Sequence, residues 1–265
     1  MILLISGLAA FTQVTLNGSY NLEPGDTYRN DTYDGVTGIN PGPAGAGVSW
    51  DFGTIPNGTF IEGIPALCVE PAGTLFADSS AVSGANLCTK NSEGSDGPYV
   101  YYSMSGTGQT LLGLGYYESG NTSFTNYTDQ LTAIEFPFAY GDEFSDTYEY
   151  LMWNVSAGGY FMRDSGSVHV EADAWGSIVT PEGSWDNVLR VTTTTVSYMW
   201  MDFGTGWVFT GIFTDVSHNW YAQGIKTPVM SISNFDDFPE YVVVYLAEHN
   251  FPVGIPEPEM NDLMI

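Results

Sequence analysis

Strict alternation of apolar and polar residues marks residues 167–175 as a half-buried strand. The alternating positions run Ser167, Val168, His169, Val170, Glu171, Ala172, Asp173 and Ala174. A period of two places the apolar side chains on one face of a strand and the polar ones on the other. Pro181 and Gly183 then supply turn residues, and a β-branched run follows at residues 188–196. The stretch is therefore predicted to be a β-hairpin.

Further short strands are predicted on both sides of this hairpin. They cover residues 13–20, 99–103, 110–117, 131–136 and 147–155, with later hairpins at 196–214 and 220–232. No segment shows apolar residues at helical spacing for three turns, so little helix is expected. Short strands separated by turn residues predict an all-β fold, an antiparallel β-sandwich or jelly-roll-like domain over residues 13–247.

Residues 241–247 are apolar on both faces, which predicts either a central strand or an edge strand that needs a partner. In the second interpretation this strand is the place where subunits join. The candidate assembly-edge residues are Tyr241, Val242, Val243, Val244 and Tyr245.

Four phrases of the sequence carry a resemblance to a known group. They are G-S-I-V-T-P-E-G-S-W-D-N-V-L-R-V at residues 176–191, G-V-S-W-D-F at 47–52, F-P-F-A-Y-G-D at 136–142, and W-Y-A-Q-G-I-K-T-P-V at 220–229. In this order they resemble secreted Bacteroidota proteins that the type IX system exports and that end in a sorting domain. The resemblance implies an extracellular or outer cell-surface location. It supplies no catalytic motif, and the sorting domain itself is not present in this chain.

The two ends of the chain fit this expectation. Residues 2–11 form an apolar run that is too short to span a bilayer, which takes about 20 residues. Residues 1–12 are therefore predicted to be a signal peptide; the alternative is a retained hydrophobic strand that inserts into a neighbouring subunit. Residues 248–265 are spaced by prolines and are predicted to be a linker toward the sorting domain.

The charge of the chain excludes two classes of partner. Five Lys and Arg residues stand against 31 Asp and Glu residues, a formal net charge of -26. Nucleic acids and anionic membranes are bound through Lys and Arg, so neither is an expected partner. The acidic surface favours solubility, with divalent cation binding as the alternative. The candidate Ca²⁺ ligands are Asp26, Asn30, Asp31 and Asp34, although clustered Asp and Asn are also common turn formers. No other cofactor is expected.

Cys68 and Cys88 lie twenty positions apart without a CxxC motif. In an exported chain this favours a disulfide, worth about 3 kcal/mol for a loop of that size. The alternative is a pair of free buried thiols.

The sequence assigns no catalytic residue. Residues 47–51 lack the second glycine of a nucleophile elbow, and His169, His218 and His249 have no metal-binding partner nearby. Glu171 and Asp173 share a strand face about 7 Å apart, which suits a glycosidase pair, but such pairs are expected by chance in so acidic a chain.

The aromatic residues and one cation bear on function. Seven Trp, 17 Tyr and 15 Phe either pack between strands or, where exposed, form a platform for sugars. Arg190 lies in an apolar strand, which predicts that it forms a buried ion pair.

The expected function is a non-catalytic secreted or cell-surface structural or adhesive protein, including a self-assembling extracellular subunit. A glycan-binding module or a polysaccharide-active enzyme is the alternative, so the expected partners are further copies of the chain or surface glycans.

Overall fold

The computed structural model describes residues 13–154, 158–235 and 238–251. The predicted signal peptide and most of the predicted linker lie outside these residues. The described chain is all-β, with two single-turn 3-10 segments at Gly18–Tyr20 and Ser80–Val82. None of its helical segments has the length and apolar character needed to cross a membrane. The expectation of an all-β chain with little helix is confirmed.

Sixteen strands form one large sheet and one small one. In chain order they are β1 (Thr15–Leu16), β2 (Thr27–Thr37), β3 (Gly45–Asp51), β4 (Thr59–Ile61), β5 (Ala66–Val69), β6 (Leu87–Asn91), β7 (Gly97–Ser105), β8 (Gly108–Glu118), β9 (Asn121–Glu135), β10 (Phe138–Ala139), β11 (Glu143–Asn154), β12 (Gly159–Thr180), β13 (Gly183–Asp202), β14 (Trp207–Ala222), β15 (Met230–Phe235) and β16 (Glu240–Asn250).

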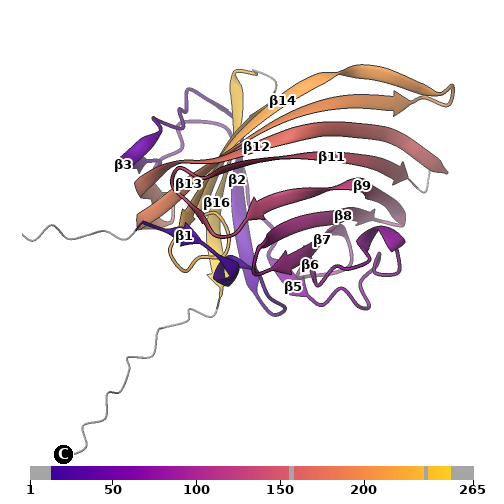
Figure 1. Cartoon of the computed structure of the whole chain (residues 1–265), viewed down its shortest axis with the longest axis horizontal. Helices are drawn as coiled ribbons and strands as arrows, with labels where there is room; N and C mark the ends of the chain where they lie inside the picture. The colour runs from indigo at the N-terminus through magenta and orange to yellow at the C-terminus, as the bar shows by residue number, and fades with distance from the viewer. Residues whose placement is uncertain (1–12, 155–157, 236–237, 252–265) are drawn as a thin grey trace, which may run out of the picture.

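The large sheet closes on itself, so the predicted sandwich or jelly roll is wrong. Neighbouring strands follow the order β11-β9-β8-β7-β6-β5-β2-β16-β15-β14-β13-β12, and β12 pairs again with β11. These pairings are antiparallel, and together they make a ring of twelve strands. β3 pairs in parallel with the end of β12, and β4 pairs with β2. Figure 1 shows β11 to β14 curving side by side, with β5 to β9 below them and β2 and β16 crossing at one side.

The central hairpin is confirmed and is longer than predicted. β12 and β13 pair from Met162↔Met201 to Thr180↔Gly183, with the turn at Pro181 and Glu182. A β-bulge between Glu171 and Ala174 reverses which side of the sheet the following residues face. Ala172 therefore belongs to the core inside the ring, whereas Ala174 belongs to the core outside it.

The inside of the ring is aromatic and partly polar. The ring of Tyr102 on β7 lies within electrostatic range of Tyr28 on β2, Tyr127 on β9 and Tyr221 on β14. These strands come from different sides of the ring, so the four side chains meet in its interior. Burial raises the pKa of Tyr102 and, to about 12, the pKa of Tyr221. One end of the interior is filled by the β1–β10 sheet, whose Leu16 and Phe138 join the inner core.

Two excursions of the chain cover the outside of the ring. Residues 38–64 carry β3 and β4 and bury Trp50 and Phe52 against Trp220 of β14. Residues 70–86 lie over β7 to β9, where Phe76 stacks on Phe124 at 5.2 Å between ring centroids. An added Cβ at Gly115 would lie 2.2 Å from the Phe76 ring, so glycine is required for this excursion to dock.

The predicted disulfide between Cys68 and Cys88 is wrong. Both thiols are free and buried, on the neighbouring strands β5 and β6. Cys68 lies opposite Thr89 and Cys88 lies opposite Val69. Adjacent residues of a strand point to opposite faces, so the two sulfur atoms lie on different sides of the sheet and cannot bond.

We expect a reducing agent to leave the melting temperature unchanged, because no bond is lost. Thermal unfolding with and without dithiothreitol measures this, and thiol titration in denaturant should find both thiols without prior reduction. Burial raises the pKa of the Cys68 thiol to about 12, so labelling of the folded protein at pH 8 should be slow. A drop in melting temperature on reduction would contradict the register of β5 and β6.

The predicted assembly edge at Tyr241 to Tyr245 is also wrong. β16 pairs with β15 on one side and with β2 on the other, so its hydrogen-bonding groups are already used. Val243 and Tyr245 are buried. The alternative interpretation of this apolar stretch, a central strand, is confirmed.

Candidate functional site

The predicted Ca²⁺ ligands do not converge on one point. Asp26 is buried and binds Lys226, with 2.9 Å between Nζ and Oδ2. Asn30, Asp31 and Asp34 lie along β2, where Asp31 accepts hydrogen bonds from Arg29 and from the Gly63 backbone N–H. Because Asn30 and Asp31 are successive residues of a strand, they point to opposite faces. Among the described residues, no group of three or more His, Cys, Asp or Glu side chains is placed to hold a metal ion.

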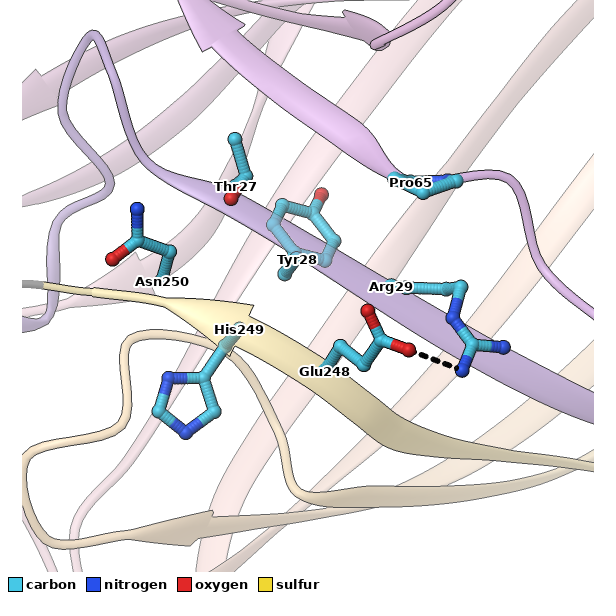
Figure 2. Close-up of a pocket in the computed structure, with 7 residues that line it drawn as sticks. All are labelled: Thr27, Tyr28, Arg29, Pro65, Glu248, His249 and Asn250. Atoms are coloured by element: carbon cyan, nitrogen blue, oxygen red, sulfur yellow. Dashed lines mark hydrogen bonds and ion pairs between the residues drawn. The ribbon is translucent and has the colours of Figure 1, made fainter.

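A small pocket lies where the start of β2 meets the end of β16 (Figure 2). Its volume is about 150 Å³, and it is lined by Thr27, Tyr28, Arg29, Pro65, Glu248, His249 and Asn250. Arg29 donates to Glu248 at 2.8 Å and also contacts Asp31 and Glu62. These carboxylates, Glu248 first, raise the pKa of the guanidinium. The cation already has three partners, so we assign this pocket a structural role in joining β2, β16 and the residue 62 segment.

The Glu171 and Asp173 carboxylates do not form a pair. The bulge in β12 falls between Glu171 and Ala174 and so includes Asp173, which is held by Arg190 through hydrogen bonds of 2.8 and 2.7 Å. Glu171 is exposed. This arrangement removes the glycosidase geometry that the sequence left open at these residues.

The three histidines lie on three different strands, β12, β14 and β16. Burial, with a contribution from the Arg190 cation, lowers the pKa of His218 to about 4, and its Nδ1 lies 2.9 Å from the Thr192 hydroxyl. His169 contacts Ser145, and His249 stacks on Phe251. Each ring has a local packing or hydrogen-bonding partner, and none of them shares a site with another.

The buried ion pair predicted at Arg190 is confirmed. Its guanidinium is 2% exposed and binds both oxygens of Asp173. It also donates to the backbone carbonyls of Pro41 and Gly42 and lies over the rings of Trp50 and Trp220. Arg190 therefore fastens the outer excursion to the ring, which is a structural role.

A larger hollow lies on the outer face of the ring, which we call the outer-face groove. Its volume is about 520 Å³, and four neighbouring strands line it, β9, β11, β12 and β13. The lining residues are Thr128, Asp129, Thr147, Tyr148, Glu149, Ser165, Gly166, Ser167 and Tyr198. Small residues on β12 lie between larger ones on its neighbours, and this difference in size makes the hollow.

The floor of the groove depends on Gly166. An added Cβ there would lie 2.2 Å from the Val196 carbonyl oxygen and 3.0 Å from the Tyr148 ring. Tyr148 lies against this bare backbone from inside the ring and donates a hydrogen bond of 3.0 Å to Asp164. Asp164 is buried, and desolvation raises the pKa of its carboxyl despite hydrogen bonds from Tyr148 and Ser197. The groove therefore has a firm floor.

Polar groups on the groove wall are fixed by one another. Glu149 on β11 lies directly opposite Asp129 on β9. Asp129 accepts a hydrogen bond of 2.8 Å from the Thr147 hydroxyl, and Glu149 lies 3.2 Å from Arg163. Each carboxylate keeps further lone pairs, so both can accept hydrogen bonds from hydroxyl groups of a ligand.

Aromatic rings continue from the groove along the same face, with Tyr198, Trp153 and Tyr160 exposed and Trp200 half-buried. The strand register sets three successive rows across β11, β12 and β13: Glu149, Ser165 and Tyr198; then Leu151, Arg163 and Trp200; then Trp153 with Tyr160. Tyr198 is 42% exposed, and Arg163 lies over the Trp200 ring at 5.1 Å. Rows two residues apart lie roughly 7 Å apart along a strand, so the rings form a linear series.

The sequence did not single out this site. Its members are scattered from residue 128 to residue 198, and they meet only because β9, β11, β12 and β13 are neighbours in the ring. One local signal was available, the small residues Ser165, Gly166 and Ser167 directly before the alternating strand. Three small residues in a strand next to large aromatic residues mark a hollow or a close approach.

Comparison with known proteins gives a distant likeness. No family model and no curated protein matches the chain. Among solved structures, one described as the crystal structure of "a putative lipoprotein" from Parabacteroides distasonis ATCC 8503 covers 88% of this chain and 99% of its own. The TM-score is 0.46 and the sequence identity is 14%. At these values the likeness assigns neither a family nor an activity.

Proposed function

We propose that this chain is a non-catalytic secreted or cell-surface protein that adheres by binding glycans in the outer-face groove. The observation that carries the proposal is one surface that combines a small-residue floor, two carboxylates and the exposed ring of Tyr198. Export to the cell surface belongs to the proposal through the resemblance to secreted Bacteroidota proteins.

The chemistry of the groove suits sugars. Carboxylate and hydroxyl oxygens form hydrogen bonds with the many hydroxyl groups of a glycan, and Asp129, Glu149 and Ser165 supply such oxygens in the groove. An aromatic ring presents an apolar face of negative electrostatic potential, against which the C–H face of a pyranose packs. A linear series of rings allows successive sugar units of a chain to stack, so the expected ligand is an oligosaccharide.

The charge of the groove narrows the ligand further. The one cation beside it, Arg163, is paired with Glu149. A sulfated or otherwise anionic glycan would meet carboxylates in a chain of net charge -26. The proposal is therefore for neutral oligosaccharides.

A polysaccharide-active enzyme is the second candidate, and one observation favours it. Glu149 and Asp129 face each other across adjacent strands, and retaining glycosidases hold two carboxyl groups about 5 Å apart. Both carboxylates are held by neighbours on the groove wall, which favours the binding role. If the protein releases reducing ends from a bound oligosaccharide and Glu149→Gln abolishes that release, the protein is an enzyme and the non-catalytic proposal is wrong.

A glycan array followed by calorimetry on the best neutral oligosaccharide tests the proposal. We expect Tyr198→Ala to weaken binding about fivefold, because it removes a stacking partner worth about 1 kcal/mol. Tyr116→Ala is the matched control, since Tyr116 on β8 has a similar exposure of 44% but lies outside the groove. An array without any neutral ligand, or equal affinity in both variants, would overturn the proposal.

A further inference from the structure

The β14 strand extends beyond β15, its neighbour on the side away from β13. β14 pairs with β13 as far as Trp207↔Asp202, but it pairs with β15 only between Asp215 and Trp220. Within the described chain, residues 207–214 thus have a strand partner on one side alone. Figure 1 shows this part of β14 as the outermost strand of the sheet. Its second edge presents backbone N–H and C=O groups that no described strand uses.

This free edge is apolar and carries no charge. Residues 203–214 read F-G-T-G-W-V-F-T-G-I-F-T, in a chain of net charge -26. About half of the surface of Trp207, Val208, Phe209 and Ile212 is exposed. Natural edge strands are usually protected by lysine, proline, an inward charge or a β-bulge, and of these only a β-bulge is present here. A strand of this kind is suited to pairing with another strand.

A β-bulge at Thr210 decides how such pairing can occur. Phe209 lies opposite Trp200 and Gly211 lies opposite Met199, so Thr210 is the additional residue. As a result Phe209 and Ile212 face the same side of the sheet, because their partners Trp200 and Tyr198 are two residues apart. Val208 and Phe213 share the other side for the same reason, through Met201 and Ser197.

We propose that the free edge of β14 pairs antiparallel with the same edge of a second copy of this chain. In this arrangement Phe209 lies opposite the partner's Ile212, and Val208 lies opposite the partner's Phe213. Both pairs then match apolar side chains on the same face, which a shift of one residue would not do. The proposal does not depend on the glycan-binding role.

Electrostatics favour a second copy as the occupant. Two molecules of charge -26 repel, so they approach most easily through a surface without charge. The eight uncharged positions 207–214 extend over about 26 Å. This length exceeds the screening length of about 8 Å at physiological salt, so charges beyond the two ends of the paired strands are largely screened from its centre. The two Asp215 carboxylates would lie at opposite ends of the pairing. In a dimer with a twofold axis, the uncharged edge of β14 in one copy pairs with the same uncharged edge in the other copy.

Sedimentation velocity of the purified chain between 1 and 100 μM tests the proposal. We expect a dimer that forms with rising concentration in the wild type, and a monomer for Phe209→Lys. Tyr116→Lys is the control, because it adds the same charge at a similarly exposed aromatic residue on a strand with two neighbours. It should still form the dimer. Both variants lower the net negative charge equally, so only loss of the edge explains a difference.

A cross-linking experiment tests the register. An equimolar mixture of Phe209→Cys and Ile212→Cys should give a disulfide-linked dimer, and each variant alone should give much less. The native thiols at Cys68 and Cys88 are buried and do not compete. A monomer at every concentration, a dimer that survives Phe209→Lys, or assembly into open chains larger than a dimer would each overturn the proposal.

Discussion

Replacing Arg190 with alanine is expected to lower the free energy of unfolding by about 3–5 kcal/mol, the usual cost of removing one partner from a buried ion pair. The Asp173 side chain is 12% exposed and would lose both of its hydrogen bonds to the guanidinium. The carbonyl oxygens of Pro41 and Gly42 would lose their donor as well. Arg190→Lys should recover only part of the loss, since an ammonium cannot reproduce the forked contact with a carboxylate.

Arg163→Ala provides the matched control. Arg163 also pairs with a carboxylate and lies over a tryptophan, but its side chain is 41% exposed. Exposed pairs contribute about 0–1 kcal/mol, so this variant should unfold close to the wild type. Urea unfolding followed by tryptophan fluorescence measures both variants. Equal stability of Arg190→Ala and Arg163→Ala would show that the outer excursion is not fastened through Arg190.

The local part of the fold could be predicted from the sequence. Residues 167–175 show a clear period of two because one face of the sheet there meets the apolar core and the other meets polar surroundings. Turn residues at Pro181 and Gly183 fixed the hairpin, and the stretch around Gly204 fixed the next one. These features depend on neighbours in the chain, which the sequence displays directly.

The strand at β2 was missed for a physical reason. The Asp and Asn residues between positions 26 and 34 were interpreted as Ca²⁺ ligands or turn formers, whereas Thr27–Thr37 is a strand. Its polar side chains are used on both faces: Asp31 binds Arg29 and Gly63 outside the core, and Tyr28 faces the other interior tyrosines. When the inside of a closed sheet is partly polar, the alternation that reveals a strand is weak.

Closure of the sheet could not be predicted from local pattern. It requires β16 to pair with β2, more than 200 residues earlier, and β11 to pair with both β9 and β12. The same non-local pairing creates the outer-face groove and uses both edges of β16. The sequence does indicate which strands are apolar and need partners, but it does not show which strands pair with each other.

Replacing Gly176 with alanine is the second change for which we expect a large effect, a loss of about 3 kcal/mol or slightly more. Gly176 lies where β12 pairs in parallel with β3, and an added Cβ would lie 1.7 Å from the Val48 carbonyl oxygen. Backbone cannot yield as a flexible side chain does, so β3 must move away from β12. That movement would separate Trp50 from the Trp220 ring, which it now meets edge-on at 5.8 Å.

Gly183→Ala, on the same hairpin, separates this effect from the general cost of replacing glycine. No atom lies within 4 Å of a Cβ added at Gly183, and its φ is not in the left-handed region. A substitution at such a surface position usually changes stability by less than about 0.5 kcal/mol. Thermal unfolding and near-ultraviolet circular dichroism of both variants measure the difference. Because β3 carries Trp50 into the outer core, Gly176→Ala should weaken the near-ultraviolet tryptophan signal, whereas Gly183→Ala should preserve it. Identical spectra and stabilities of the two variants would mean that β3 does not lie against β12.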